Sequence, residues 1–144
     1  MGSSTAFVII NSSDCTAPNY SFVITASTTA ASALALSGGN DFVDVAHTTA
    51  LNAYPLTVET WFKTNVSNNI ETSLLTKYVA ASNNGWNMFI QNGFVKGWYF
   101  GSSGNRVTSI PLASTLTVND NNWHHAAFVV DASGGRIYID GALS

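Results

Sequence analysis

The sequence has few charged residues. Asp, Glu, Lys and Arg make up 9% of its 144 residues, only 5 of them are Lys or Arg, and the net charge is −3. The basic residues form no cluster. Because nucleic-acid binding needs Lys or Arg to displace counterions from phosphates, the composition argues against a nucleic-acid partner.

Long apolar runs and helical periodicity are also missing. The uninterrupted apolar runs are only a few residues long, whereas a membrane-spanning helix needs about 20 apolar residues. No segment repeats its apolar residues with a period of 3.6. The sequence therefore predicts no membrane span and little helix.

Cysteine is limited to Cys15, so no intrachain disulfide can form and a zinc site would lack its usual ligands. Ser, Thr and Asn together make up about a third of the chain, far above their average usage. Such a surface is typical of secreted β-proteins. We expect an extracellular or cell-surface protein whose export signal lies outside this chain.

The first 26 residues predict a β-hairpin. An apolar run, Phe7 to Ile10, is followed by a polar turn and then by Tyr20, Phe22 and Ile24 at alternate positions. This unit resembles the closing strands of immunoglobulin-like repeats in large secreted bacterial proteins. Residues 27–32 are small and polar without periodicity, which predicts a linker, and residues 33–144 then form a second domain.

From residue 33 onward, strand patterns follow one another. Strands are expected at 34–36, 41–45, 56–63, 73–79, 86–91, 94–100, 106–112, 124–131 and 136–140, and a polar turn at 116–122. Asn92-Gly93 between two such runs predicts a hairpin with a type I′ turn. Ile137 and Ile139 alternate with polar residues, which predicts one buried face, and Asp140-Gly141 opens another turn.

Five segments occur in a fixed order: ALSGGNDFVDV (35–45), LTVETWFKT (56–64), SLLTKY (73–78), WNMFIQNGFVKGWY (86–99) and NNWHHAAFVVDASGGRIYIDG (121–141). In this order they resemble the concanavalin A-like jelly roll of laminin G-like and pentraxin-like domains. The resemblance implies an all-β fold, an antiparallel two-sheet jelly-roll sandwich. That family continues past the Tyr-x-Asp-Gly turn, so we expect this chain to lack its C-terminal strands or to receive them from neighbouring chains.

Glycosidases also occur on this fold, with carboxylates that share one face of a strand. Here Glu59 has Thr57 and Trp61 as its same-face neighbours, and Asp41 and Asp44 are three residues apart, so they point to opposite faces of a regular strand. Retaining chemistry requires two carboxylates close together. The sequence therefore predicts a protein that is not an enzyme.

The adjacent His124 and His125 should face opposite ways in a strand, so they cannot chelate one metal together. We interpret one as packed beside Trp123 and the other as hydrogen-bonded at a sheet surface. A Ser–His–Asp triad stays open as an alternative, although no nucleophile-elbow motif supports it.

Calcium is the candidate cofactor, since the resembled family often holds calcium at one end of the sandwich. Asn40 and Asp41 are the candidate metal ligands, with Asp44 and Asp120 as further oxygen donors, because calcium takes six to eight oxygens. The alternative is that Asn40 and Asp41 only support the turn after Gly38-Gly39 by hydrogen bonds to the backbone.

Exposed aromatic rings beside amides suit sugar binding, although core packing is the default for Trp. Trp61 and Trp123 sit in motif positions that we interpret as structural. The candidate ligand-binding residues are Trp86 with the neighbouring Asn83 and Asn84, and Trp98 with Arg106.

These features predict a non-catalytic recognition module of a large exported or cell-surface protein. It would bind a glycan or a surface partner through loops at one end of the sandwich. One alternative is a structural or assembly domain of an adhesin, filament or virion, in which strand edges meet partners. A further alternative is a glycosidase-associated domain, which would need an acid pair outside this chain.

Overall fold

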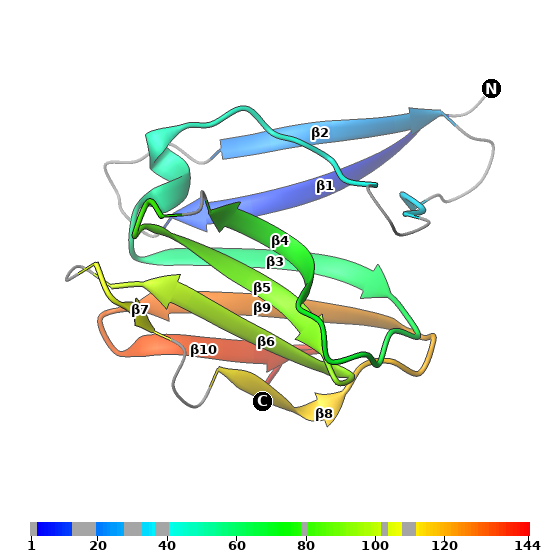
Figure 1. The fold of residues 1–144 in the computed structure, drawn as a ribbon. Coiled ribbons are helices and arrows are strands. Elements are labelled where there is room, and N and C mark those ends of the chain that lie inside the picture. Colours follow the sequence, from blue (N-terminus) through cyan, green and yellow to red (C-terminus); the bar gives the residue numbers. More distant parts are fainter. Residues whose placement is uncertain are drawn as a thin grey trace.

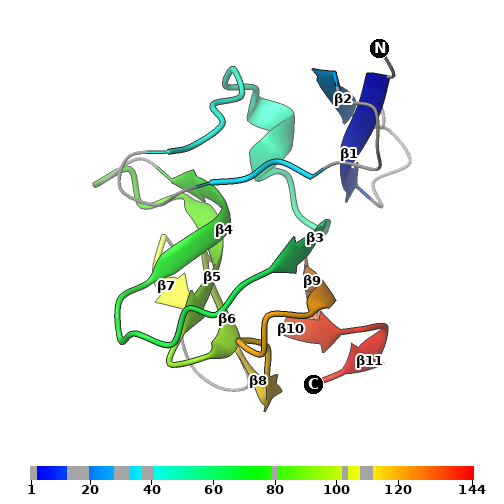
Figure 2. The same ribbon diagram turned by 90° about the vertical axis from the view of Figure 1, so that its right-hand side faces the viewer.

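Apolar residues at alternate positions build two antiparallel sheets, which the computed structural model stacks face to face (Figures 1 and 2). The structure describes residues 3–12, 20–27, 33–36, 41–78, 81–101, 104–107 and 112–144, with the backbone alone for the first two ranges. The single helical element of these residues is a 3-10 turn, η1 (Thr49–Asn52).

The first sheet has six strands and the second has five. The six-stranded sheet runs in the order β11 (Ala142–Leu143), β10 (Gly134–Ile139), β9 (Trp123–Asp131), β3 (Leu56–Lys63), β1 (Ser3–Ser12) and β2 (Tyr20–Ser27). The five-stranded sheet runs β4 (Thr72–Tyr78), β5 (Gly85–Gln91), β6 (Phe94–Phe100) and β7 (Arg106–Val107), and β8 (Ala113–Thr117) also pairs with β6.

The core lies between the sheets and is formed by one face of each. In the six-stranded sheet, Val58 of β3 lies opposite Phe128 of β9, and both are fully buried. The predicted alternation in β10 is confirmed, since Ile137 and Ile139 are 0% and 1% exposed. The core as a whole contains Leu56, Val58, Phe62, Trp86, Met88, Ile90, Val95, Leu112, Val118, Ala126, Phe128, Val130, Ile137 and Ile139.

The predicted turns at Asn92-Gly93 and Asp140-Gly141 are confirmed, whereas the predicted turn at Gly38-Gly39 lies outside the described residues. Asn92 and Gly93 have φ angles of 55° and 80°, and Gln91 pairs with Phe94 across the turn. Both residues of a type I′ turn need positive φ, which Asn and Gly adopt readily. Asp140-Gly141 repeats this pattern between β10 and β11, with φ angles of 51° and 83°.

Four segments differ from the sequence-based expectation. Residues 34–36 and 41–45 form no strand, and Phe42 is 77% exposed, because no described strand pairs with them and alternation without a neighbour builds no ladder. The expected turn at 116–122 begins later, because residues 116 and 117 belong to β8. β7 covers Arg106–Val107 of the expected 106–112 strand, of which residues 108–111 lie outside the described residues.

The N-terminal strands extend the six-stranded sheet. β1 pairs with β2 from Ser3↔Ser27 to Ile10↔Tyr20, and it pairs with β3 only from Ile10↔Val58 to Ser12↔Leu56. Beyond that contact β1 and β3 diverge (Figure 1). The division into a hairpin (1–26), a linker (27–32) and a jelly-roll domain (33–144) stays a prediction, and residues 28–32 lie outside the described residues.

Gly97 of β6 provides a test of how closely the sheets approach. A Cβ at this position would lie 3.0 Å from two carbons of the Phe128 ring, which is fully buried. We expect Gly97→Ala to lower the free energy of unfolding by about 1–3 kcal/mol, as overpacking does in other cores. Chemical denaturation measures this loss.

The matched control is Gly101→Ala, where the new Cβ would lie 3.8 Å from its nearest neighbour, an ordinary contact. This variant should unfold close to the wild type. Equal destabilisation of the two variants would contradict the proposed steric cause.

Candidate ligand-binding site

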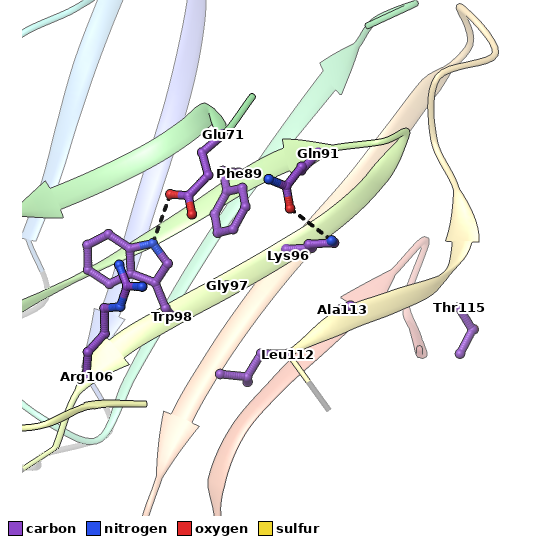
Figure 3. Close-up of a pocket in the computed structure, with 10 residues that line it drawn as sticks. All are labelled: Glu71, Phe89, Gln91, Lys96, Gly97, Trp98, Arg106, Leu112, Ala113 and Thr115. Carbon is purple, nitrogen blue, oxygen red and sulfur yellow. Dashed lines mark hydrogen bonds between the residues drawn. The ribbon is translucent and has the colours of Figure 1, made fainter. Parts of the chain in front are cut away.

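A groove lies on the outer face of the five-stranded sheet, away from the core. It has a volume of about 470 Å³ and is open to solvent. On this face, Phe89 of β5 lies opposite Lys96 of β6, and Asn87 of β5 lies opposite Trp98 of β6. The lining residues are Glu71, Phe89, Gln91, Lys96, Gly97, Trp98, Arg106, Leu112, Ala113 and Thr115 (Figure 3).

The floor of the groove is aromatic and closely packed. Phe89, Trp98 and Phe100 form a buried cluster separate from the main core. The ring of Tyr78 meets Trp98 edge-on at 5.0 Å between centroids and stacks on Phe100 at 5.8 Å. Such contacts hold the indole in one orientation, so the polar side chains that contact the indole are also held in place.

Polar groups surround the Trp98 indole. Its Nε1 donates a hydrogen bond to Oε2 of Glu71 at 3.2 Å, and the guanidinium of Arg106 lies over the ring, 5.4 Å from its centroid (Figure 3). The Nζ of Lys96 donates to Oε1 of Gln91 at 3.0 Å. The cation over the ring is a cation–π contact, which is favourable because the ring face is electronegative. The lining thus carries two cations and one carboxylate.

Asn87 adds a buried amide beside Trp98. It is 4% exposed, and its Oδ1 has no hydrogen-bond partner among the described residues. A buried acceptor without a partner costs about 1–3 kcal/mol. Nothing in the packing of the described residues offsets this cost. A hydrogen-bond donor of a ligand that reached Oδ1 of Asn87 would remove it.

The structure brings together two of the sequence-predicted residues and separates a third from them. Trp98 and Arg106 both line the groove. Trp86 lies in the core instead, 3% exposed, with its Nε1 donating to the carbonyl of Leu51 at 2.9 Å. Because Trp86 precedes Asn87 in a strand, its side chain points to the opposite face, and both sides of its ring are covered.

Asn83 and Asn84 are exposed in the turn between β4 and β5 and do not line the groove. Asn83 has a φ of 51°, which suits a turn residue. Oδ1 of Asn84 accepts hydrogen bonds from Nδ2 of Asn52 at 3.5 Å and from Oγ of Ser82 at 3.3 Å. These contacts give both residues a role in shaping the turn.

The predicted calcium ligands are only partly visible. Asn40 lies outside the described residues, and Asp41 is exposed. In the described part of the chain, no three His, Cys, Asp or Glu side chains gather as a metal site would require. The calcium site therefore stays a prediction.

A second hollow of about 440 Å³ lies where the chain enters β3 and turns from β9 into β10, and it is lined by Tyr54, Pro55, Tyr99, Gly101, Val130, Asp131 and Ala132. Two of its polar side chains have partners within the chain. Tyr54 donates its hydroxyl to the carbonyl of Gly85 at 3.2 Å, and burial raises its pKa to about 12. The Asp131 carboxylate is held by the guanidinium of Arg136. The groove around Trp98 is the better candidate, because two cations and a carboxylate line it, whereas Asp131 is the single charged residue that lines the second hollow.

Glu71, Gln91 and Lys96 were missed in the sequence. A signal for two of them exists, because the two-residue turn Asn92-Gly93 fixes the pairing of β5 with β6 and so places Gln91 and Lys96 on the same face as Trp98. Glu71 precedes β4 and reaches Trp98 only through the tertiary fold.

A family model of laminin G-like domains, described as the concanavalin A-like lectin/glucanases superfamily, matches residues 37–144. The chain belongs to the concanavalin A-like superfamily. The match confirms the resemblance seen in the five ordered segments, and the two antiparallel sheets are those of a concanavalin A-like sandwich. No curated protein and no solved structure matches the chain. Among the described residues, no helix is long and apolar enough to cross a membrane.

The two histidines of this concanavalin A-like domain face opposite ways, as the strand pattern predicts. Nδ1 of His124 lies 2.9 Å from Oδ2 of Asp140, and its Nε2 lies 3.1 Å from Oδ1 of Asp120. His125 lies on the other face, against the ring of Trp61. Because both nitrogens of His124 are engaged, neither is free to take a proton from a nucleophile. The cluster joins β9 to the β10–β11 turn.

The charges of this cluster support one another. The hydrogen bonds from the His124 ring to Asp140 and then to Asp120 raise the pKa of His124 above 6.5. The pKa of Asp120 falls to about 2, chiefly through hydrogen bonds from Asn122 and then from His124. The backbone N–H of His125, and then the His124 ring, lower the pKa of Asp140. Near pH 6 the site thus holds an imidazolium between two carboxylates.

His124 should make stability depend on pH. Its pKa is higher in the folded state than in the unfolded state, so its contribution is fully present below about pH 6.5 and is lost as the pH rises through the folded pKa. We expect His124→Gln to flatten the fall in melting temperature between about pH 6 and about pH 9. Thermal unfolding followed by circular dichroism measures the melting temperature at each pH.

His125→Gln is the matched control, because it leaves the cluster of Asp120, His124 and Asp140 in place. It should keep the pH profile of the wild type. An unchanged profile in His124→Gln would show that the cluster does not govern this dependence.

Proposed function

We propose that this domain is a non-catalytic binding module that holds an acidic glycan in the groove around Trp98. The observation that carries the proposal is the convergence of Arg106, Lys96, Gln91 and Glu71 on one aromatic floor. Ligand sites commonly combine an apolar lining with a few placed polar groups, and a volume of about 470 Å³ falls in their usual range.

The chemistry of the lining favours a sugar over an apolar ligand. Gln91, Lys96, Glu71 and Arg106 offer donors and acceptors suited to hydroxyl groups, and they lie above a floor of buried aromatic side chains. Trp98 is 5% exposed, so it supports the groove and positions Arg106 more than it offers its own ring face.

The charge of the lining favours an acidic sugar. Arg106 and Lys96 outnumber the single carboxylate of Glu71. Among the described residues, the Arg106 guanidinium lies over Trp98 and forms no salt bridge, which leaves its N–H groups available. A guanidinium binds a carboxylate through two parallel hydrogen bonds, so Arg106 is the expected partner of the acidic group.

The arrangement of carboxyl groups supports the absence of catalysis. Glycoside hydrolysis needs two carboxyl groups beside the bond that breaks, and Glu71 is the single one among the lining residues. Asp120 and Asp140 lie together at His124, but their lowered pKa values oppose the role of a general acid, which requires a raised pKa.

We infer an exported or cell-surface parent protein from the composition, in which hydroxyl and amide side chains replace charged ones. Asn40 and Asp41 remain the candidate ligands for calcium, so binding should be measured with and without this ion.

The decisive experiment is a glycan array probed with the full chain, with calcium and with a chelator. We expect binding to glycans that carry a carboxylate. For a glycan that binds, Arg106→Ala should weaken the affinity about 10-fold to 100-fold, because a charge-assisted hydrogen bond is lost. Isothermal titration calorimetry measures the change.

Arg136→Ala is the matched control, since it removes the same group from β10 of the other sheet. It should bind like the wild type. The proposal is wrong if no glycan binds under either condition, or if both substitutions reduce the affinity equally.

A further inference from the structure

The second part of β3 has an open edge. This strand pairs with β9 over its full length, from Leu56↔Val130 to Lys63↔Trp123, but with β1 only at Leu56 to Val58. No described strand pairs with Glu59 to Lys63 on the β1 side, where β1 diverges from β3 (Figure 1). An open edge presents backbone N–H and C=O groups on which another strand can pair.

A large exposed aromatic side chain lies at the centre of this edge. Trp61 is 65% exposed, and Trp123 on the neighbouring β9 is 51% exposed on the same face. A Trp side chain buries roughly 150–250 Å², so these rings alone fall short of the roughly 800 Å² per partner of a standard interface. A partner that binds here therefore needs the backbone edge as well as the rings.

The sequence of the open segment is complementary to itself. Glu59 stands two residues before Trp61, and Lys63 stands two residues after it, so all three side chains share the outer face. If two copies of this segment pair antiparallel with Trp61 opposite Trp61, Glu59 of each copy lies opposite Lys63 of the other. Each dimer then gains two ion pairs that flank a pair of indoles.

The contacts that Glu59 and Lys63 make within the chain leave both side chains accessible to a second copy. Glu59 lies 3.6 Å from Nε2 of His125, with its side chain 35% exposed. Lys63 is exposed and has no carboxylate within salt-bridge distance among the described residues. β1 pairs with this edge only from Leu56 to Val58, so it takes none of the backbone hydrogen-bonding groups from Glu59 to Lys63.

We propose that the domain self-associates through antiparallel pairing of Glu59–Lys63 with the same segment of a second copy. The interface is isologous, with a twofold axis at Trp61. Because only five residues of each copy pair, the association is weak and depends on concentration. It is independent of the proposed glycan site, which lies on the other sheet.

The test is a charge exchange followed by sedimentation velocity of the full chain, from about 5 µM to about 500 µM. The wild type should shift from monomer to dimer over this range. Glu59→Lys and Lys63→Glu each place two like charges opposite one another, and each should raise the dissociation constant about tenfold. The double variant restores opposite charges and should dimerise within about threefold of the wild type.

Lys77→Glu is the matched control, because it reverses a charge on β4 of the other sheet and should leave the dissociation constant unchanged. Circular dichroism spectra show whether each variant is folded. A monomer at every concentration, or a double variant no better than the single ones, would overturn the proposal. Glycan binding by the single variants should equal that of the wild type, so failure here and failure of the glycan site are distinguishable.

Discussion

The contact between Gly97 of β6 and the ring of Phe128 on β9 sets how closely the two sheets approach. The ring occupies the space that any side chain at residue 97 would need, and it is fully buried. The N–H of Gly97 also donates to the carbonyl of Leu112, which precedes β8 and lines the groove. The same residue therefore joins the core to the wall of the candidate site, so the groove depends on the packing of the sandwich.

Each strand can bury only one face against the opposite sheet. This constraint places Trp86 and Trp98 on opposite faces of the five-stranded sheet. Trp86 and Trp98 lie on strands joined by Asn92-Gly93, and the register of that hairpin puts Trp98 opposite Asn87. Trp86 must then point into the core. The opposite placement of Trp86 and Trp98 could be derived from the sequence by counting residues from the turn. The fold could also be predicted, because the five ordered segments resemble those of the family.

Other features depend on neighbours that local patterns do not reveal. Glu71 reaches Trp98 from the segment before β4, so its role in the groove follows from tertiary packing. Trp61 occupies a motif position that suggested a structural role, yet it is exposed, because its side chain lies on the outer face of β3, away from the core. Residues 41–45 alternate like a strand but lack a partner strand among the described residues. Alternation predicts which face is buried only where an adjacent strand exists.

With only 13 charged residues, 5 basic and 8 acidic, the chain places several of them in small groups with separate roles. Asp120, His124 and Asp140 fasten β9 to the β10–β11 turn. Two basic side chains and one carboxylate line the groove on one sheet, and an acid and a base flank Trp61 on the other. Because the remaining surface is largely uncharged, few other charged side chains lie nearby to compete with these groups for a charged partner. The sparse charge pattern therefore gives each of the two proposed interactions its own group of charges, one on each sheet.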